Sequence, residues 1–245
     1  MFFSILFSVF LVSLVSFVGI FFLALKERTL GNFLELFISF AVGSMLGDAF
    51  IHILPEATEN LGEKTFLLTV ISFLVFFVLE KFLYWRHCHL EHCQTHPFTY
   101  LSLIGDTIHN FIDGTIIAAS FLTNFSLGIT TTLAVIFHEI PQEIGDFSIL
   151  IYGGLEKKKA IFLNFLSALS AFLGALLVYF FFRQISGLID YLLPFAAGNF
   201  LYLSGTDIIP ELREKAKNSL RSSLYQFILV CTGLFLMWFL KELMG

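Results

Sequence analysis

Apolar stretches of about 20 residues recur along the whole chain, and this repetition constrains the fold more than any other feature. A helix needs about 20 consecutive apolar residues to cross a bilayer. With 57% hydrophobic and only 13% charged residues, the 245-residue chain also has too little polar surface for a water-soluble globule. We therefore predict an all-α integral membrane protein embedded in a lipid bilayer. The apolar stretches place eight transmembrane helices near residues 1–25, 33–54, 65–85, 98–122, 126–152, 160–182, 187–209 and 222–241.

The first apolar stretch is predicted to be a retained helix, because Lys26 and Arg28 follow it instead of preceding it as in a signal peptide. No linker is long enough to separate a second domain, so we predict one transmembrane domain over residues 1–245. Three cysteines do not suggest a disulfide framework. The net charge of −5 gives no support for nucleic-acid binding.

The basic residues predict how the chain is oriented, because cytoplasmic loops are enriched in lysine and arginine. With the N-terminus outside, eleven basic residues face the cytosol and three face outward. We therefore predict extracytoplasmic N- and C-termini, in a plasma or inner membrane. The three outward residues are Lys64, Arg183 and Lys241.

An internal repeat gives a second constraint on the fold. Residues 41–56 align without gaps on residues 196–211, with Pro55-Glu56 on Pro210-Glu211. The second and seventh helices run in opposite directions, so the repeat is inverted, with helices 1–3 related to 6–8 around a central helix 4/5 pair. Inverted repeats of this kind are typical of secondary transporters. The alternative is a chance coincidence of short apolar strings.

The fourth and fifth helices carry many polar residues at membrane depth. Such residues are costly in a bilayer and are expected to line a functional polar site, although single ones also support helix contacts. The candidates are His109, Asn110, Asp113, His138, Glu139, Gln142, Glu143, Asp106 and Asp146.

The spacing of these residues predicts a metal site. Residues four apart project from the same face of a helix, so His109 lies over Asp113 and His138 over Gln142. Imidazole and oxygen ligands together suit Zn²⁺, with Fe²⁺, Mn²⁺ and Cd²⁺ as competitors. Asn110 and Glu139 each follow the histidine of their helix by one residue, so they lie on a neighbouring face of the helix pair. Glu143, Asp146 and Asp106 extend the polar stripe.

These motifs resemble those of the ZIP (Zrt/Irt-like) divalent metal transporters over nearly the whole chain. The resemblance rests on His109-Asn110-Phe111-x-Asp113-Gly114, on His138-Glu139-Ile140-Pro141-x-Glu143, and on the two Pro-Glu segments. It implies a binuclear centre, with His109, Asp113, His138 and Gln142 at one metal and Asn110, Asp113, Glu139 and Gln142 at the other. It also implies uptake into the cytosol by elevator-like sliding of helix bundles.

Two departures from the family pattern concern the metal site. Gln142 stands where such members usually have histidine, and an amide is a weaker ligand that does not titrate. Residues 167–172 lack the glutamate that many bacterial members carry on the sixth helix. Affinity, selectivity and the second metal position are therefore expected to differ.

Further polar groups are predicted along the route of the ion. Asp48 and His52 are expected to form an outer relay, with Asp207 and Glu211 as its inner counterpart. Residues 86–97 form a cytosolic loop whose composition is typical of zinc binding. Its candidate ligands are His87, Cys88, His89, His92, Cys93 and His96.

We therefore predict a secondary transporter, not an enzyme, that moves divalent transition metals, most readily Zn²⁺. Two alternatives remain. The first is an intramembrane zinc protease, which would need a histidine at the position of Gln142. The second is a membrane metal sensor that moves no ions. The sequence leaves a homodimer open.

Overall fold

The structure, a computed structural model, describes residues 1–20, 27–87, 96–215 and 219–244. Every regular element in these ranges is helical, which confirms the predicted all-α class. In chain order the elements are α1 (Phe2–Val15), η1 (Ser16–Gly19), α3 (Glu27–Gly47), η2 (Asp48–Ile53), α4 (Leu54–Leu61), α5 (Lys64–His87), α6 (Pro97–Thr123), α7 (Phe125–Tyr152), α8 (Lys157–Ala168), α9 (Ser170–Tyr202), η3 (Leu203–Ile208), α10 (Ile209–Lys215) and α11 (Leu220–Met244).

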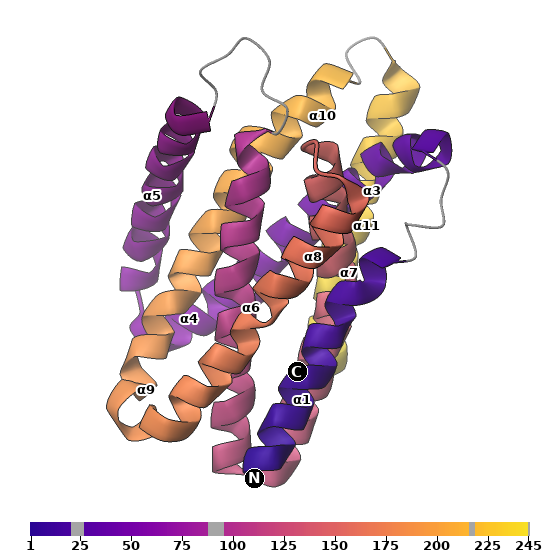
Figure 1. The fold of residues 1–245 in the computed structure, drawn as a ribbon. Coiled ribbons are helices and arrows are strands. Elements are labelled where there is room, and N and C mark those ends of the chain that lie inside the picture. Colours follow the sequence, from indigo (N-terminus) through magenta and orange to yellow (C-terminus); the bar gives the residue numbers. More distant parts are fainter. Residues whose placement is uncertain (21–26, 88–95, 216–218, 245) are drawn as a thin grey trace.

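The described helices form the eight predicted spans (Figure 1). The second span joins α3, η2 and α4, and the seventh joins the end of α9 to η3 and α10. Judged by length and composition alone, only five helical stretches of the described chain qualify as membrane spans, and α6 and α7 are not among them. These two helices carry the charged motifs, which lower their hydropathy.

The boundary between the sixth and seventh spans is a kink at Phe181. Two helices meet there, as the sequence predicts, and together they make up the 33 residues of α9; at Phe181 φ is −125° and ψ is 15°, outside helical geometry. Figure 1 shows α9 turning at the lower end of the molecule.

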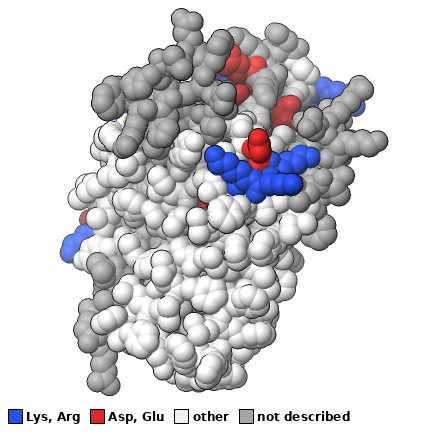
Figure 2. Space-filling view, viewed as in Figure 1, with Lys and Arg blue, Asp and Glu red and all other residues white. Residues whose placement is uncertain are grey.

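The outer surface matches a lipid environment. Figure 2 shows a broad face without charged residues over the lower part of the view, with most of the charged residues in the upper half and a small group at the left edge. Exposed apolar patches of this extent are unusual for soluble proteins. On α5 and α11 the large exposed apolar side chains include Phe66, Leu67, Val70, Leu74, Val78, Leu224, Phe227, Phe235 and Phe239.

The two halves of the internal repeat share a local distortion. Each contains a six-residue π-helix, η2 and η3, placed directly before the aligned Pro55 and Pro210. Residues 48–53 fall on residues 203–208 in the alignment. Figure 1 shows α4 at the lower end of the bundle and α10 at the upper end. The equivalent elements therefore lie at opposite ends, as an inverted repeat requires, and π-helical turns are often found at functional sites.

A tight connection places the two motif helices side by side. α6 ends at Thr123, and Asn124 adopts an extended conformation and caps α7 by accepting a hydrogen bond from the Ser126 amide at 2.8 Å. The chain thus reverses over one residue. Both motifs lie roughly three to five helical turns from Asn124, so they meet at the same depth.

Close backbone contact fixes α6 against α9. A Cβ atom on Gly114 would lie 1.9 Å from the Ala171 carbonyl oxygen, and one on Gly174 would lie 2.0 Å from that of Phe111. Small residues at such contacts let membrane helices pack closely. Because Gly114 directly follows Asp113, this contact also holds the polar face of α6 in place.

We expect Gly114→Ala to destabilise the protein by about 1–3 kcal/mol, because the added methyl group must push α6 and α9 apart. Thermal unfolding of the detergent-purified protein measures this loss. Gly205→Ala is the matched control, because a Cβ there meets no atom within 4 Å. Equal stability of the two variants would contradict the close contact.

Candidate metal centre

His109 and Asp113 form the α6 side of the centre. They are four residues apart and share one face, with His109 Nε2 3.6 Å from Asp113 Oδ2. Both residues are buried, with 4% and 3% of their surface exposed. Ionisable groups held this deeply need a partner of opposite charge or a metal ion.

His138 and Glu139 bring the α7 side to the same point. His138 Nε2 lies 3.2 Å from Asp113 Oδ2, and Glu139 Oε1 lies 3.5 Å from His109 Nε2. One ligand atom from each of the four residues lies within 4.8 Å of all the others. Around a tetrahedral zinc ion with ligands near 2.1 Å, neighbouring ligand atoms stand about 3.4 Å apart. The observed spacings fit a divalent ion.

Several polar atoms around this centre lack a protein partner. Among the described residues, His109 Nε2, Glu139 Oε1, Asn110 Oδ1 and Gln142 Nε2 are buried without a hydrogen bond. Buried polar groups in folded proteins are almost always paired, so this concentration points to a ligand. Gln142 follows His138 by one turn and is 5% exposed, as ligation requires. Its place in the ligand shell stays a prediction.

A cavity of about 330 Å³ leads to the centre from the end of the bundle that carries α4. It reaches His109, Asp113 and His138 and also includes the exposed Glu56 and Glu59. Carboxylates at its mouth attract cations. The cavity therefore gives a metal ion access to the centre from one side of the molecule.

The predicted outer pair lies in this cavity beside the centre. His52 Nδ1 and Asp48 Oδ1 are 2.9 Å apart within η2. The other carboxylate oxygen of Asp48, Oδ2, lies 3.9 Å from His109 Nδ1. Asp48 thus connects the cavity with the candidate ligand His109.

If Asp48 receives the ion, we expect Asp48→Asn to raise the KM for zinc uptake about tenfold with a smaller change in kcat, since about 1.4 kcal/mol of attraction is lost. Initial uptake rates in liposomes over a range of zinc concentrations measure this. Glu63→Gln, an exposed acid that does not line the cavity, serves as the control. An unchanged KM in Asp48→Asn would remove Asp48 from the route.

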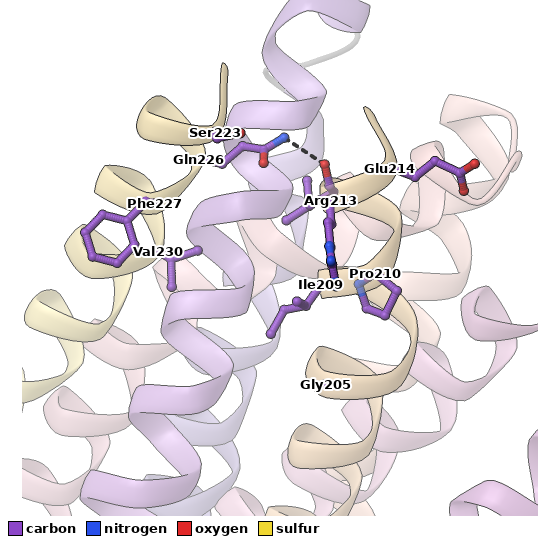
Figure 3. Close-up of a pocket in the computed structure, with 10 residues that line it drawn as sticks. Gly205, Ile209, Pro210, Arg213, Glu214, Ser223, Gln226, Phe227 and Val230 are labelled. Carbon is purple, nitrogen blue, oxygen red and sulfur yellow. Dashed lines mark hydrogen bonds between the residues drawn. The ribbon is translucent and has the colours of Figure 1, made fainter. Parts of the chain in front are cut away.

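The structure does not bring the predicted inner pair to the centre. Glu211 accepts a hydrogen bond of 2.7 Å from the Tyr152 hydroxyl, and Asp207 accepts one of 3.3 Å from Thr206. A wider cavity of about 1080 Å³ lies between α10 and α11 (Figure 3). There Gln226 Nε2 donates to the Leu212 carbonyl oxygen at 3.1 Å. None of the four central ligands lines this cavity.

Glu143, Asp146 and Asp106 are not among the four residues whose ligand atoms lie within 4.8 Å of one another. Asn164 on α8 donates a short hydrogen bond to Glu143, and Ser167 on α8 donates one to Asp106. Sequence analysis did not identify these two α8 residues as site residues. A buried asparagine in an apolar helix was the available signal, but only the packing of α8 on α6 and α7 reveals its partner.

Most of the predicted loop site lies outside the described residues. This applies to Cys88, His89, His92 and Cys93, and to the side chain of His87. His96 is exposed, its ring stacks on Phe98, and its amide donates to the Gly153 carbonyl oxygen at 2.9 Å. This backbone hydrogen bond connects the start of α6 to the end of α7.

Comparisons with known proteins agree with this geometry. A family model described as ZIP zinc transporter matches residues 2–96 and 86–241. Zinc transporter ZIP13 of Mus musculus is 33% identical over 246 residues, covering 82% of this chain and 68% of the mouse protein. Human ZIP13 is 30% identical, with coverages of 83% and 70%.

Zinc transporter zipt-7.2 of Caenorhabditis elegans is 40% identical over 144 residues, covering 57% of this chain and 30% of the nematode protein. The chain spans about two thirds of the length of the ZIP13 relatives that it matches. With eight membrane-spanning helices, a polar centre between α6 and α7, and a family match over nearly all of its length, this chain belongs to the ZIP zinc transporter family.

Proposed function

We propose that the chain carries Zn²⁺ across the membrane into the cytosol through the centre between α6 and α7. The observation that carries this proposal is the approach of four ligand atoms, from His109, Asp113, His138 and Glu139, to within 4.8 Å of one another. Two neutral imidazoles and two carboxylates suit a borderline divalent ion. Thiolates are not among these four ligands, which favours release over permanent storage.

The direction of transport follows from the predicted orientation. Lys157, Lys158 and Lys159 begin α8 at the end of the bundle opposite α4, and basic residues favour the cytoplasmic side. The cavity that reaches the centre therefore faces outward, with both chain ends on that side. We propose a plasma or inner membrane as the location, and the whole of residues 1–245 as one transport unit.

An elevator-type movement is the mechanism we propose. The helices form two groups. In the first, α1, α6, α7 and the part of α9 before Phe181 pack together, with Ile5, Ile117 and Ala175 in one apolar cluster. In the second, α3 packs on α11, and α5 packs on the part of α9 beyond Phe181, where Ser72 donates to the Phe195 carbonyl oxygen. Sliding of the first group would carry the metal ligands from the outer cavity toward α10. Asp48 on η2 stays with the second group, so its contact with His109 breaks as the ion moves.

The resemblance to the family implies two metal positions, and the residues expected at each are arranged differently. The His109, Asp113 and His138 atoms suit the first position. At the second position, Asn110 directs its amide nitrogen to Asp106 Oδ1 at 2.7 Å. Occupancy of the second position, a homodimer and a metal-gathering role for the 86–97 loop remain predictions.

Uptake of metal by the purified chain in liposomes tests the proposal. Zn²⁺, Fe²⁺, Mn²⁺ and Cd²⁺ are supplied one at a time, with empty liposomes as the control. Saturable Zn²⁺ uptake supports transport. Zinc binding without uptake would instead support a metal sensor. ZIP proteins are transporters and not enzymes, so the protease alternative is set aside.

A further inference from the structure

Three buried carboxyl groups lie beyond the imidazole ligands, toward the start of α6 and the end of α7. Asp106, Glu143 and Asp146 are 2%, 1% and 3% exposed. Within the described part of the chain, no Lys, Arg or His nitrogen forms an ion pair with them. Asp106 repels both Glu143 and Asp146. Unpaired buried carboxylates are too costly to persist without a compensating cation or proton.

The amide side chain of Asn164 supplies an independent sign of a ligand. Asn164 Nδ2 donates to Glu143, and Asn110 Nδ2 donates to Asp106 Oδ1. The carbonyl oxygen of each amide is buried and has no hydrogen-bond partner among the described residues. Asn164 is 0% exposed, so its carbonyl oxygen needs a partner inside the protein.

Further oxygen atoms of the same carboxyl groups also lack a hydrogen-bond partner in the described part of the chain. Glu143 Oε1 and Asp146 Oδ2 lack partners as well, again within the described chain. The remaining oxygens are held in place, since Ser102 donates to Asp146 Oδ1 at 3.1 Å and Ser167 donates to Asp106. Ionised carboxylates and amide oxygens only accept hydrogen bonds, so they cannot satisfy one another, whereas a cation is attracted to each of them.

We propose that Asp106, Glu143, Asp146 and Asn164 form an all-oxygen site for a divalent cation, separate from the imidazole centre, with Asn110 connecting the two through its hydrogen bond to Asp106. Among the described residues, only the His109 group brings three or more His, Cys, Asp or Glu ligand atoms within 4.8 Å of one another, so the three carboxylates do not all meet at one point in this conformation. The cation therefore binds fewer of them directly, and amide oxygens or water complete its shell. Carboxylate and carbonyl ligands suit Mn²⁺, Mg²⁺ and Ca²⁺ better than they suit zinc. This proposal rests on the proposed transport function, in which the site receives the ion after the imidazoles and lets it leave.

Mn²⁺ binding to the purified full chain tests the site, with free Mn²⁺ measured by electron paramagnetic resonance. We expect the double variant Glu143→Gln, Asp146→Asn to weaken Mn²⁺ binding at least about tenfold, because two charged ligands are lost. Co²⁺ binding at the imidazoles, followed by its absorption spectrum, should persist. His138→Ala should give the reverse pattern. Asp190→Asn, an acid paired with Asn60, is the control.

A single substitution covers the case in which the double variant fails to fold. Asn164→Asp adds a carboxylate at the same position and should tighten Mn²⁺ binding several-fold. Unchanged Mn²⁺ affinity in Asn164→Asp, or equal loss of Mn²⁺ in the double variant and in His138→Ala, would overturn the separate site. Zinc uptake by the wild type is measured in parallel, so Mn²⁺ binding without uptake counts against the transport proposal alone.

Discussion

Asp113→Ala is expected to lower zinc uptake in liposomes at least about a hundredfold, because ligand loss reduces metal affinity by that order or more. Asp113 Oδ2 lies 3.2 Å from His138 and 3.6 Å from His109, so one carboxylate joins the two helices of the centre. Its removal takes away a ligand and also leaves two imidazoles without their neighbouring negative charge. His109→Ala is expected to have a similar effect.

Folding must be separated from function in this test. Size-exclusion profiles and thermal unfolding of the purified variants show whether the helical bundle is intact. Asp190→Ala, which removes an acid that bonds Asn60 outside the centre, should retain wild-type uptake. Wild-type uptake by folded Asp113→Ala protein would contradict the assignment of the metal centre.

Gln142→His is expected to tighten zinc binding about tenfold or more, since a neutral imidazole is a better zinc ligand than an amide. Gln142 lies one turn beyond His138 on α7, buried and with an unpaired amide nitrogen. Tighter binding should slow release, so the maximal rate of uptake is expected to fall. Isothermal titration and initial uptake rates measure the two quantities.

The same substitution should make zinc binding more sensitive to acid. A histidine must lose its proton to bind metal, and its ordinary pKa is about 6.5. Below that pH, each added imidazole ligand steepens the loss of affinity by about tenfold per pH unit. Gln226→His, at a buried glutamine on α11 away from the centre, should leave both properties unchanged. Identical pH profiles for Gln142→His and the wild type would place residue 142 outside the ligand shell.

The eight spans and the polar stripes on α6 and α7 could be predicted because both depend on local sequence. Apolar length determines whether a helix crosses a bilayer, and spacing of four places His109 over Asp113 whatever surrounds them. The internal repeat was visible for the same reason. The π-helical turns of the repeat could not be predicted, because no pattern of residue types before Pro55 and Pro210 distinguishes a π-helix from an α-helix.

Contacts between helices far apart in the sequence could not be predicted from spacing. Asp48 approaches His109 because η2 packs beside α6, and Asn164 reaches Glu143 because α8 packs on α7. Helical periodicity says which face a residue occupies but not which neighbour meets that face. The sequence by itself therefore determined the membrane fold and the family and predicted the candidate ligands, whereas only the tertiary structure decided which buried oxygens face one another, because that depends on how the helices pack.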